Sequence, residues 1–292
     1  MNSTIAVLKV LLLSQLLVFV FTLQLTRDND KLLTEVPAAY REKCADMLNG
    51  KARTFGQAFQ DWVVYHNFFK KLAKPYRGIY IDVGTNHPTM ISNTVFFDKC
   101  LGWQGLCIEP QERYHDLIKR ERSCTLVPHC VLGRERSVDF SGSGGERQAV
   151  VKVDGAGTCK AFLDVVQQHN ITRIDFLSID IEKSEPDVLR CLPFEEIHIG
   201  LVLIETNKAH LRETDLFFHR HGYSNVETFL NVLSNDTTNY WLDNLYQKRR
   251  HYSYPSTAAE CSTEEVIHRQ SWCADWQEWK SGPTDWGVCK GV

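Results

Sequence analysis

Acidic side chains stand at or just after the ends of several apolar runs in this 292-residue chain. They are Asp82 in run 79–83, Glu109 after run 105–108, Asp180 and Glu182 in and after run 174–181, and Glu205 at the end of run 200–205. Carboxylates accept hydrogen bonds from hydroxyl groups, remove protons and attract cations. If these runs are parallel strands, their carboxyl ends lie at one edge of a sheet, where open α/β sheets bind ligands. The pattern therefore predicts a carboxylate-rich binding edge.

The stretch GIYIDVGTNHPTMISNT, residues 78–94, has the form of a strand and loop that open a nucleotide-cofactor site. A dinucleotide site needs further glycines so that the backbone can approach a pyrophosphate, but Asn86 and Thr89 occupy those positions. No P-loop lysine follows either. The loop therefore favours a cofactor with a ribose and a base but no phosphate, such as S-adenosylmethionine. Glu109 has the spacing of a carboxylate that binds ribose hydroxyls.

Strand-like and helix-like runs alternate along the chain, which predicts an α/β fold with a doubly wound, mostly parallel sheet. The strand-like runs are 79–83, 105–108, 125–132, 174–181 and 200–205, and the helix-like runs are 91–100, 111–120, 159–169, 185–192 and 209–221. An amphipathic helix over 54–73, with Thr54 as a candidate N-cap, precedes them, and strands 223–233 and 238–242 close the pattern. Segment 134–157 interrupts it, either as a hairpin inserted over the ligand edge or as a flexible loop.

Three stretches, YIDVGTNHPTMISNT, LGWQGLCIEPQERYHDL and IDFLSIDIEKSEPDVL, resemble the FkbM-type methyltransferases, especially the membrane-anchored animal members. The order and intervals of the motifs agree over residues 76 to about 240. The resemblance implies a class I methyltransferase fold, which is Rossmann-like, with a seven-stranded sheet, helices on both faces and antiparallel last strands. It also implies S-adenosylmethionine as the cofactor and O-methylation, often of a sugar hydroxyl.

The resemblance assigns roles to residues at three strand ends. The implied cofactor-binding residues are Asp82, Gly84, Thr85 and Asn86 in the first loop, Glu109 at the ribose, and Asp180 near the reacting centre. Methyl transfer from a sulfonium is an in-line displacement, which a base assists by removing the hydroxyl proton of the acceptor. The candidates for that base are Asp180, Glu182 and His87.

The chain departs from the family pattern at two positions of the implied site. Pro88 stands where the family commonly has glycine, and Lys183 replaces the glycine of D-x-E-G. Lys183 adds a cation that pairs with Glu182 or repels a sulfonium. These departures favour an alternative function, that of a non-catalytic, membrane-anchored protein that binds a partner in secretory trafficking.

Metal ions and nucleotide sugars are two further ligand classes that carboxylates can bind. No metal site is predicted, although Asp180, Glu182 and Glu205 offer the oxygen ligands that magnesium or manganese prefers. A glycosyltransferase is a weaker alternative, because the chain has no convincing D-x-D motif. The formal net charge of -3 argues against a nucleic acid partner. The expected acceptor is a glycan or a small hydroxyl compound.

Residues 5–25 form an apolar run that would span about 30 Å as a helix, the thickness of a bilayer core. The run predicts a transmembrane signal anchor over 1–25, followed by a stem over 26–50, a methyltransferase-like domain over 51–250 and a Cys- and Trp-rich appendage over 251–292. The chain is then a single-pass type II membrane protein with a lumenal domain in the Golgi or endoplasmic reticulum. The alternative is secretion after signal cleavage.

Cysteines and glycosylation motifs agree with a lumenal domain. Some of the ten cysteines are expected to form disulfides, with Cys124 and Cys130 as one candidate pair and Cys261, Cys273 and Cys289 as further candidates. Cys107 is expected to be a buried thiol, because it lies in an apolar run. Asn170 and Asn235 lie in N-x-T motifs, which predict a glycoprotein.

Overall fold

The computed structural model describes residues 14–15, 29–72, 76–143, 146–151, 155–189, 192–207, 210–230 and 241–249. Nearly all of the predicted anchor, the whole appendage and Asn235 lie outside these residues. Within the described ranges, no helix is both long enough and apolar enough to cross a membrane.

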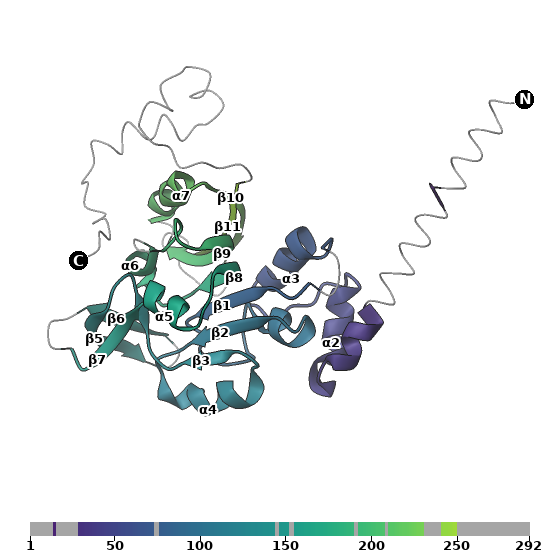
Figure 1. Ribbon diagram of the computed structural model, residues 1–292, viewed down its shortest axis with the longest axis horizontal. Coiled ribbons are helices and arrows are strands. Elements are labelled where there is room, and N and C mark those ends of the chain that lie inside the picture. Colours follow the sequence, from purple (N-terminus) through teal and green to yellow (C-terminus); the bar gives the residue numbers. More distant parts are fainter. Residues whose placement is uncertain are drawn as a thin grey trace, which may run out of the picture.

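A seven-stranded sheet forms the centre of the protein, in the order β10-β11-β9-β8-β1-β2-β3 (Figure 1). Its strands are β1 (Ile79–Val83), β2 (Gln104–Ile108), β3 (Thr125–Val127), β8 (Arg173–Ile179), β9 (His198–Asn207), β10 (Tyr223–Leu230) and β11 (Trp241–Lys248). Five of these strands are parallel to one another, namely β3, β2, β1, β8 and β9. The last two, β11 and β10, are antiparallel to their neighbours. The predicted doubly wound, mostly parallel sheet is therefore confirmed. Its strand order reverses direction between β1 and β8, the place where such sheets bind ligands.

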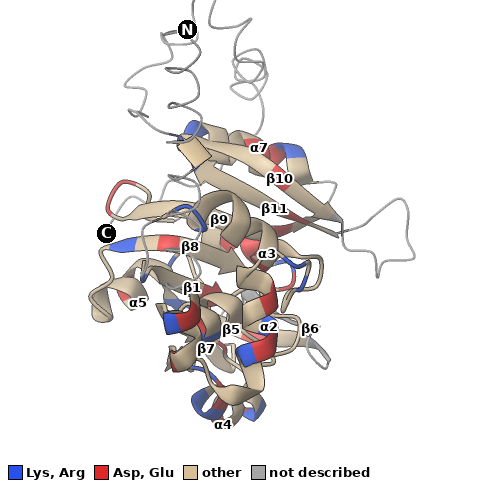
Figure 2. Ribbon diagram, turned by 90° about the vertical axis from the view of Figure 1, so that its right-hand side faces the viewer, with Lys and Arg blue, Asp and Glu red and all other residues tan. Residues whose placement is uncertain are grey.

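Helices cover both faces of this sheet. They are α2 (Ala38–Leu48), α3 (Gln60–Val64), the π-helices η1 (Tyr65–Phe69) and η2 (Phe96–Cys100), α4 (Glu112–Glu121), α5 (Phe162–Gln168), α6 (Glu185–Leu189) and α7 (Leu211–Arg220). Alternate side chains of β1 enter two hydrophobic cores, because successive strand residues point to opposite faces. Ile81 belongs to the core that includes residues of α5, α6 and α7, and Tyr80 to the core that includes residues of α2, α3, η2 and α4. Residues of both charges occur along α2 and α4 (Figure 2).

A second, four-stranded sheet stands beside the main one, in the order β4-β7-β5-β6. It consists of β4 (Val131–Leu132), β5 (Arg136–Ser143), β6 (Glu146–Val151) and β7 (Gly157–Ala161). β5 and β6 pair as an antiparallel hairpin, so the inserted hairpin is the correct alternative for segment 134–157. The predicted single strand 125–132 is wrong, because it divides into β3 and β4 in different sheets. Pro128, which has no N–H for a strand ladder, lies in the break.

Two predicted helices begin five or more residues later than expected. The helix predicted over 54–73 begins at Gln60, after Phe59 in a left-handed conformation with φ 64. Thr54 is not its N-cap, because its hydroxyl and the Phe55 N–H donate to the carboxylate of Asp61 and hold a bend before the helix. The helix predicted over 91–100 is likewise shortened to η2, and Ile91 has a left-handed φ of 54.

Cysteine pairing differs from the sequence prediction. The disulfides are Cys44–Cys100, Cys107–Cys124 and Cys130–Cys159, and none of the six described cysteines is free. Neither the Cys124–Cys130 pairing nor the free thiol at Cys107 is correct, because pairing depends on which strands become neighbours. Cys44 also ties α2 to η2, and Met47 is fully buried in the same core. Helix α2, in the segment predicted as a stem, is thus packed against the main domain.

Candidate functional site

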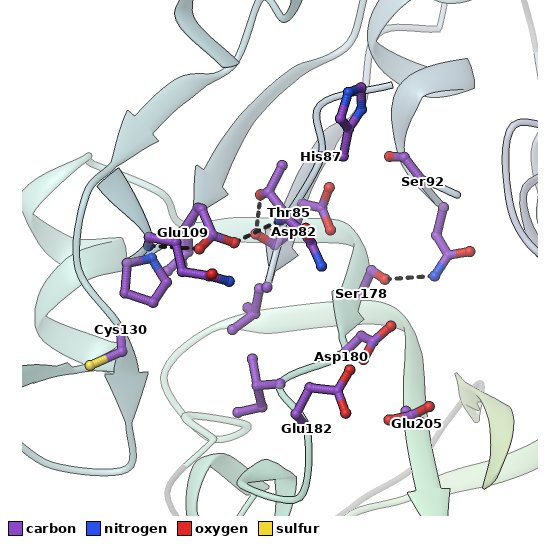
Figure 3. A pocket seen from close by; sticks show the side chains of 18 of the residues that line it. Asp82, Thr85, His87, Ser92, Glu109, Cys130, Ser178, Asp180, Glu182 and Glu205 are labelled. Atoms are coloured by element: carbon purple, nitrogen blue, oxygen red, sulfur yellow. Dashed lines mark hydrogen bonds between the residues drawn. The ribbon is translucent and has the colours of Figure 1, made fainter. Parts of the chain in front are cut away.

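A cleft of about 560 Å³ lies at the carboxyl ends of the parallel strands (Figure 3). The loop after β1 and the ends of β2, β8 and β9 form its walls, and Phe140 of the inserted hairpin also lines it. The volume is in the range of small-molecule and cofactor sites. The cleft brings together every site residue that the sequence singled out, namely Asp82, Gly84, Thr85, Asn86, His87, Glu109, Asp180, Glu182 and Glu205.

Gly84 lets the loop after β1 approach the end of β8. Its φ is 87, and a Cβ atom at this position would lie 1.8 Å from the carbonyl oxygen of Asp180. Only glycine therefore fits. The Gly84 and Thr85 N–H groups donate to the Ile108 carbonyl oxygen at 3.0 and 3.2 Å, and the Asp180 N–H donates to the Val83 carbonyl oxygen at 3.0 Å. The backbone thus fixes the ends of β1, β2 and β8 at one point.

Glu109 holds the loop from the neighbouring strand. One of its carboxylate oxygens accepts the Asn86 N–H at 2.7 Å, and the other accepts the Gln111 N–H at 2.7 Å. Burial raises the pKa of Glu109, while these two hydrogen bonds oppose the rise. Each oxygen keeps a further lone pair for a ligand hydroxyl. The ribose-binding role of Glu109 remains a prediction that this geometry permits.

Arg122 is a buried centre of the site that sequence reasoning missed. Its guanidinium donates to Asp98 (2.6 Å), the Thr94 hydroxyl (2.7 Å), the Tyr80 hydroxyl (3.1 Å) and the Pro88 carbonyl oxygen (3.1 Å). No sequence signal marks it, because an arginine at the end of the polar helix α4 is ordinarily expected in solvent.

Asp82 faces this network with its side chain. Its carboxylate accepts a hydrogen bond from the Thr94 hydroxyl at 2.6 Å and lies 3.6 Å from Nη1 of Arg122. Burial raises the pKa of Asp82, and the charge of Arg122 opposes the rise. Asp82 therefore anchors the loop, and its predicted contact with the cofactor remains to be tested.

Three carboxylates converge at the ends of β8 and β9. Asp180, Glu185 and Glu205 each offer an oxygen within 4.8 Å of the others. Asp243 of β11 lies opposite Glu205 in the sheet and accepts a hydrogen bond from Gln60 at 2.5 Å. Such a cluster could hold a divalent cation, with Glu185 in the place that the sequence assigned to Glu182. Acidic groups also gather in this way without a metal, and nothing else in the described residues points to one.

The crowding of these acids shifts their proton affinities. Burial, followed by repulsion from Glu185 and Asp243, raises the pKa of Glu205 to about 8. Burial, with a contribution from Glu182, raises the pKa of Glu185 to about 7. The Asp180 side chain is exposed to the cleft. Desolvation by the surrounding protein is the main cause that raises its pKa well above the usual value, and the charge of Glu205 is the second. The cluster therefore retains protons near neutral pH.

Glu182 and Lys183 form a left-handed turn after β8, with φ values of 56 and 78. Both line the cleft, and the N–H groups of Ile181 and Lys183 donate to a carboxylate oxygen of Glu185 at 2.9 and 3.3 Å. The φ of Lys183 explains why glycine is common here in the family, since a side chain is strained in this conformation.

His87 stands apart from the acidic cluster, at the opposite end of the cleft in Figure 3. Its Nδ1 atom accepts the N–H groups of Thr89 and Met90 at 3.3 and 3.1 Å. A neutral imidazole with an accepting Nδ1 carries its proton on Nε2, so it has no free nitrogen with which to act as a base. This arrangement favours the carboxylates over His87 as proton acceptors.

Comparisons with known proteins give one family match and several similar solved structures. Residues 82–225 match the family model described as the methyltransferase FkbM domain. No curated protein sequence matches the chain. Among solved structures, the chain is similar to methyltransferase FkbM from Methylobacillus flagellatus KT, with 16% identity, 76% of this chain and 58% of that chain covered, and a TM-score of 0.34. It is also similar to a 1,6-didemethyltoxoflavin-N1-methyltransferase from Burkholderia thailandensis, with 10% identity, coverages of 73% and 85%, and a TM-score of 0.37.

The family match extends from Asp82 at the end of β1 to Asn225 in β10, and so includes the Gly84 loop, Glu109 and the acidic cluster. Residues 82–225 are therefore the part of the chain that matches the methyltransferase FkbM domain.

Proposed function

We propose that the protein is an S-adenosylmethionine-dependent O-methyltransferase of the secretory pathway that acts on a hydroxyl group of a sugar. The observation that carries the proposal is the single cleft that joins the Gly84 loop, Glu109 and the Asp180–Glu205 pair. Each element alone is common in proteins. Together they supply a loop that packs closely on the end of β8, a carboxylate after β2, and acid–base groups at the ends of β8 and β9.

The residues of the cleft fit S-adenosylmethionine. Glu109 has lone pairs for the ribose hydroxyls, and Gly84 lets the loop after β1 pack against the carbonyl oxygen of Asp180, which brings Glu109 and Asp180 to the same cleft. When bound, the cofactor supplies a methyl group on a positively charged sulfur. The carboxylates of Asp180 and Glu205 complement that charge, and a cation nearby lowers their pKa values.

Asp180 and Glu205 are the proposed proton acceptors. Two crowded carboxylates that cannot both ionise easily hold one proton between them, which leaves one ionised member as a base. The acceptor oxygen gains the methyl group as the carbon–sulfur bond breaks, and its proton passes to that carboxylate. Glu205 thus joins the predicted bases Asp180 and Glu182.

The described cysteines support the secretory location. Three disulfides link Cys44–Cys100, Cys107–Cys124 and Cys130–Cys159. Disulfides of this kind persist in oxidising compartments and are rare in the cytosol. The apolar run at 5–25 supports membrane anchoring with the domain in the lumen.

Calorimetric titration of S-adenosylmethionine into the full-length chain tests the proposal. We expect binding, and we expect Glu109→Gln to weaken it by about 1–3 kcal/mol, because one ribose hydrogen bond acceptor becomes a donor. Glu112→Gln, at an exposed position in α4, is the matched control and should bind as the wild type does. Absence of binding would overturn the enzyme assignment.

Lys183 supports a second candidate, a non-catalytic partner-binding protein. Its cationic side chain lines the same cleft that would hold the sulfonium. The titration separates the two functions, because only the enzyme requires the cofactor. Binding that is present in Lys183→Gly and absent in the wild type would favour a domain that has lost its activity.

A further inference from the structure

A second cleft, of about 400 Å³, lies between α6, α7 and the end of β9. Lys183, Glu185 and Glu205 line it, and Lys183 and Glu205 also line the first cleft. The two clefts therefore meet at the acidic cluster. A ligand in the second cleft would present one end to the groups that we propose as proton acceptors.

Thr206 supplies an independent sign that this cleft takes a ligand. The residue is 5% exposed, it lines the second cleft, and its hydroxyl oxygen has no hydrogen-bond partner among the described residues. A buried hydroxyl without a partner is unfavourable and uncommon. Thr214, which lines the same cleft, instead donates to the His210 carbonyl oxygen at 3.0 Å. The difference marks Thr206 as a place for an oxygen atom of a ligand.

Three apolar residues form part of the cleft wall. Pro186 and Leu189 of α6 and Ile204 of β9 line it, and Leu189 and Ile204 are almost completely buried. A free sugar would leave this wall without a complementary surface. A ligand with an apolar part would place that part against this wall, cover the partly exposed Pro186, and remove its own apolar surface from water.

We infer that the second cleft is the acceptor subsite and that it binds a glycoside with an apolar aglycone. This inference rests on the proposed function and names its substrate class. The sugar hydroxyls face Glu185 and Glu205, an oxygen of the glycoside meets Thr206, and the aglycone lies on Pro186, Leu189 and Ile204. A cleft of this volume suits a small molecule rather than a protein surface.

A series of n-alkyl β-D-glucosides, from methyl to hexyl and below micelle-forming concentrations, tests the inference. Calorimetric titration into the full-length wild-type chain should show affinity that rises with chain length, by about threefold to fourfold for each methylene that becomes buried. Pro186→Trp narrows the cleft at a partly exposed position and should abolish the dependence on chain length. Val226→Trp places the same side chain on exposed β10, outside both clefts, and should keep it.

Thr206→Val is the second variant, because it preserves the shape of the side chain and removes only the hydroxyl. We expect weaker binding of every glucoside, by about fivefold to tenfold, since one hydrogen bond is lost. S-adenosylmethionine affinity should not change in any of these variants, which also shows that they fold. Equal affinity for methyl and hexyl glucoside in the wild type, or a dependence that persists in Pro186→Trp, would overturn the inference. Glucoside binding without S-adenosylmethionine binding would instead contradict the proposed function and leave the cleft assignment intact.

Discussion

Nη1 of Arg122 donates a hydrogen bond to the carbonyl oxygen of Pro88 at 3.1 Å. Pro88 stands where the family commonly has glycine, and it is buried at the turn that follows the Gly84 loop. The same guanidinium also holds Asp98 and Thr94, so the turn is attached to α4 and η2 rather than to β1 alone. The proline is therefore accommodated by a buried side-chain network, and it is not by itself a sign of a collapsed loop.

Removal of this network should destabilise the protein strongly. Arg122→Met removes the closest cation from the buried carboxylates of Asp82 and Asp98, and we expect a loss of about 3–5 kcal/mol in the free energy of unfolding. Denaturant unfolding with intact disulfides measures it. Arg120→Met, which removes an exposed arginine that pairs with Glu121, should change stability by less than about 1 kcal/mol. Equal effects in the two variants would contradict the central role of Arg122.

The double variant Arg122→Met with Asp98→Asn separates charge from packing. If unpaired charge is the main cause of the loss, removal of one carboxylate should restore part of the stability lost in Arg122→Met. No recovery would indicate that the hydrogen bonds to Tyr80 and Pro88 matter more.

The left-handed turn at Lys183 predicts a stabilising substitution. Lys183→Gly relieves a φ of 78 and should raise the free energy of unfolding by up to about 1 kcal/mol, although glycine also gains entropy in the unfolded chain. Thermal unfolding at pH 6 is a suitable measurement. Lys119→Gly in the helix α4 is the opposite control and should lower stability by about 1 kcal/mol. A destabilised Lys183→Gly variant would mean that the lysine makes contacts that outweigh the strain.

The acidic cluster predicts that the protein is less stable in alkaline solution. A carboxyl group whose pKa is raised by folding favours the folded state while it is protonated, so this contribution is present below pH 4.5 and is lost as the pH rises through the folded pKa. For Glu185 that pKa is about 7 and for Glu205 about 8, which places the loss between about pH 5 and pH 9. Glu185→Gln should be as stable as the wild type at pH 5 and more stable by roughly 1–3 kcal/mol at pH 9. Glu112→Gln should show no such difference, and parallel pH profiles for Glu185→Gln and the wild type would contradict the raised pKa.

The same cluster predicts pH-dependent selection between the cofactor and its demethylated product. S-adenosylmethionine carries a positive sulfur and S-adenosylhomocysteine a neutral one, so only the former gains from ionised carboxylates. We expect the ratio of their affinities to shift towards S-adenosylmethionine as the pH rises from 6 to 9, by about tenfold if one further carboxylate ionises close to the sulfur. Titrations of both ligands across this range measure the ratio. Glu205→Gln should flatten the dependence, and a ratio that is constant with pH in the wild type would place the sulfur away from the cluster.

Asn170 predicts a glycan at a defined turn. It is exposed just after α5, with a left-handed φ of 55, and it begins the motif Asn170-Ile171-Thr172. Expression through the secretory pathway should add a glycan that a glycosidase removes, and Asn170→Gln should lower the mass by one glycan. Thr172→Ala should have the same effect, whereas Thr172→Ser should keep the glycan. An unglycosylated Asn170 in protein from secretory expression would argue against the lumenal placement.

Local sequence patterns were enough to predict those parts of the site that consist of one strand and the turn after it. The apolar run 79–83 matches β1, and Gly84 ends it because the chain must turn with a positive φ. Glu109 follows the second strand at the spacing that the sequence indicated. Alternation of strands and helices predicted the parallel sheet, since each run carries its own periodicity.

Long-range packing decided the rest. The chemistry of Arg122 depends on Asp82, Asp98 and Pro88, which lie far from it in the sequence, and no local pattern specifies that they meet. The start of α3 likewise depends on Asp61, whose carboxylate binds the preceding bend. Cysteine partners were beyond prediction for the same reason, because only the assembled sheets place Cys107 beside Cys124 and Cys130 beside Cys159.

The sequence alone thus determined the sheet, the cofactor-type loop and the acidic strand ends, because these follow from periodicity and from the conformational limits of glycine. Only the tertiary structure decided which acids share one site. The left-handed turn at Glu182 and Lys183 brings Glu185 of α6 to Asp180 and Glu205, whereas the sequence had assigned Glu182 to that position. A carboxylate acquires its proton affinity from burial and from neighbouring charges, and both exist only after the chain has folded.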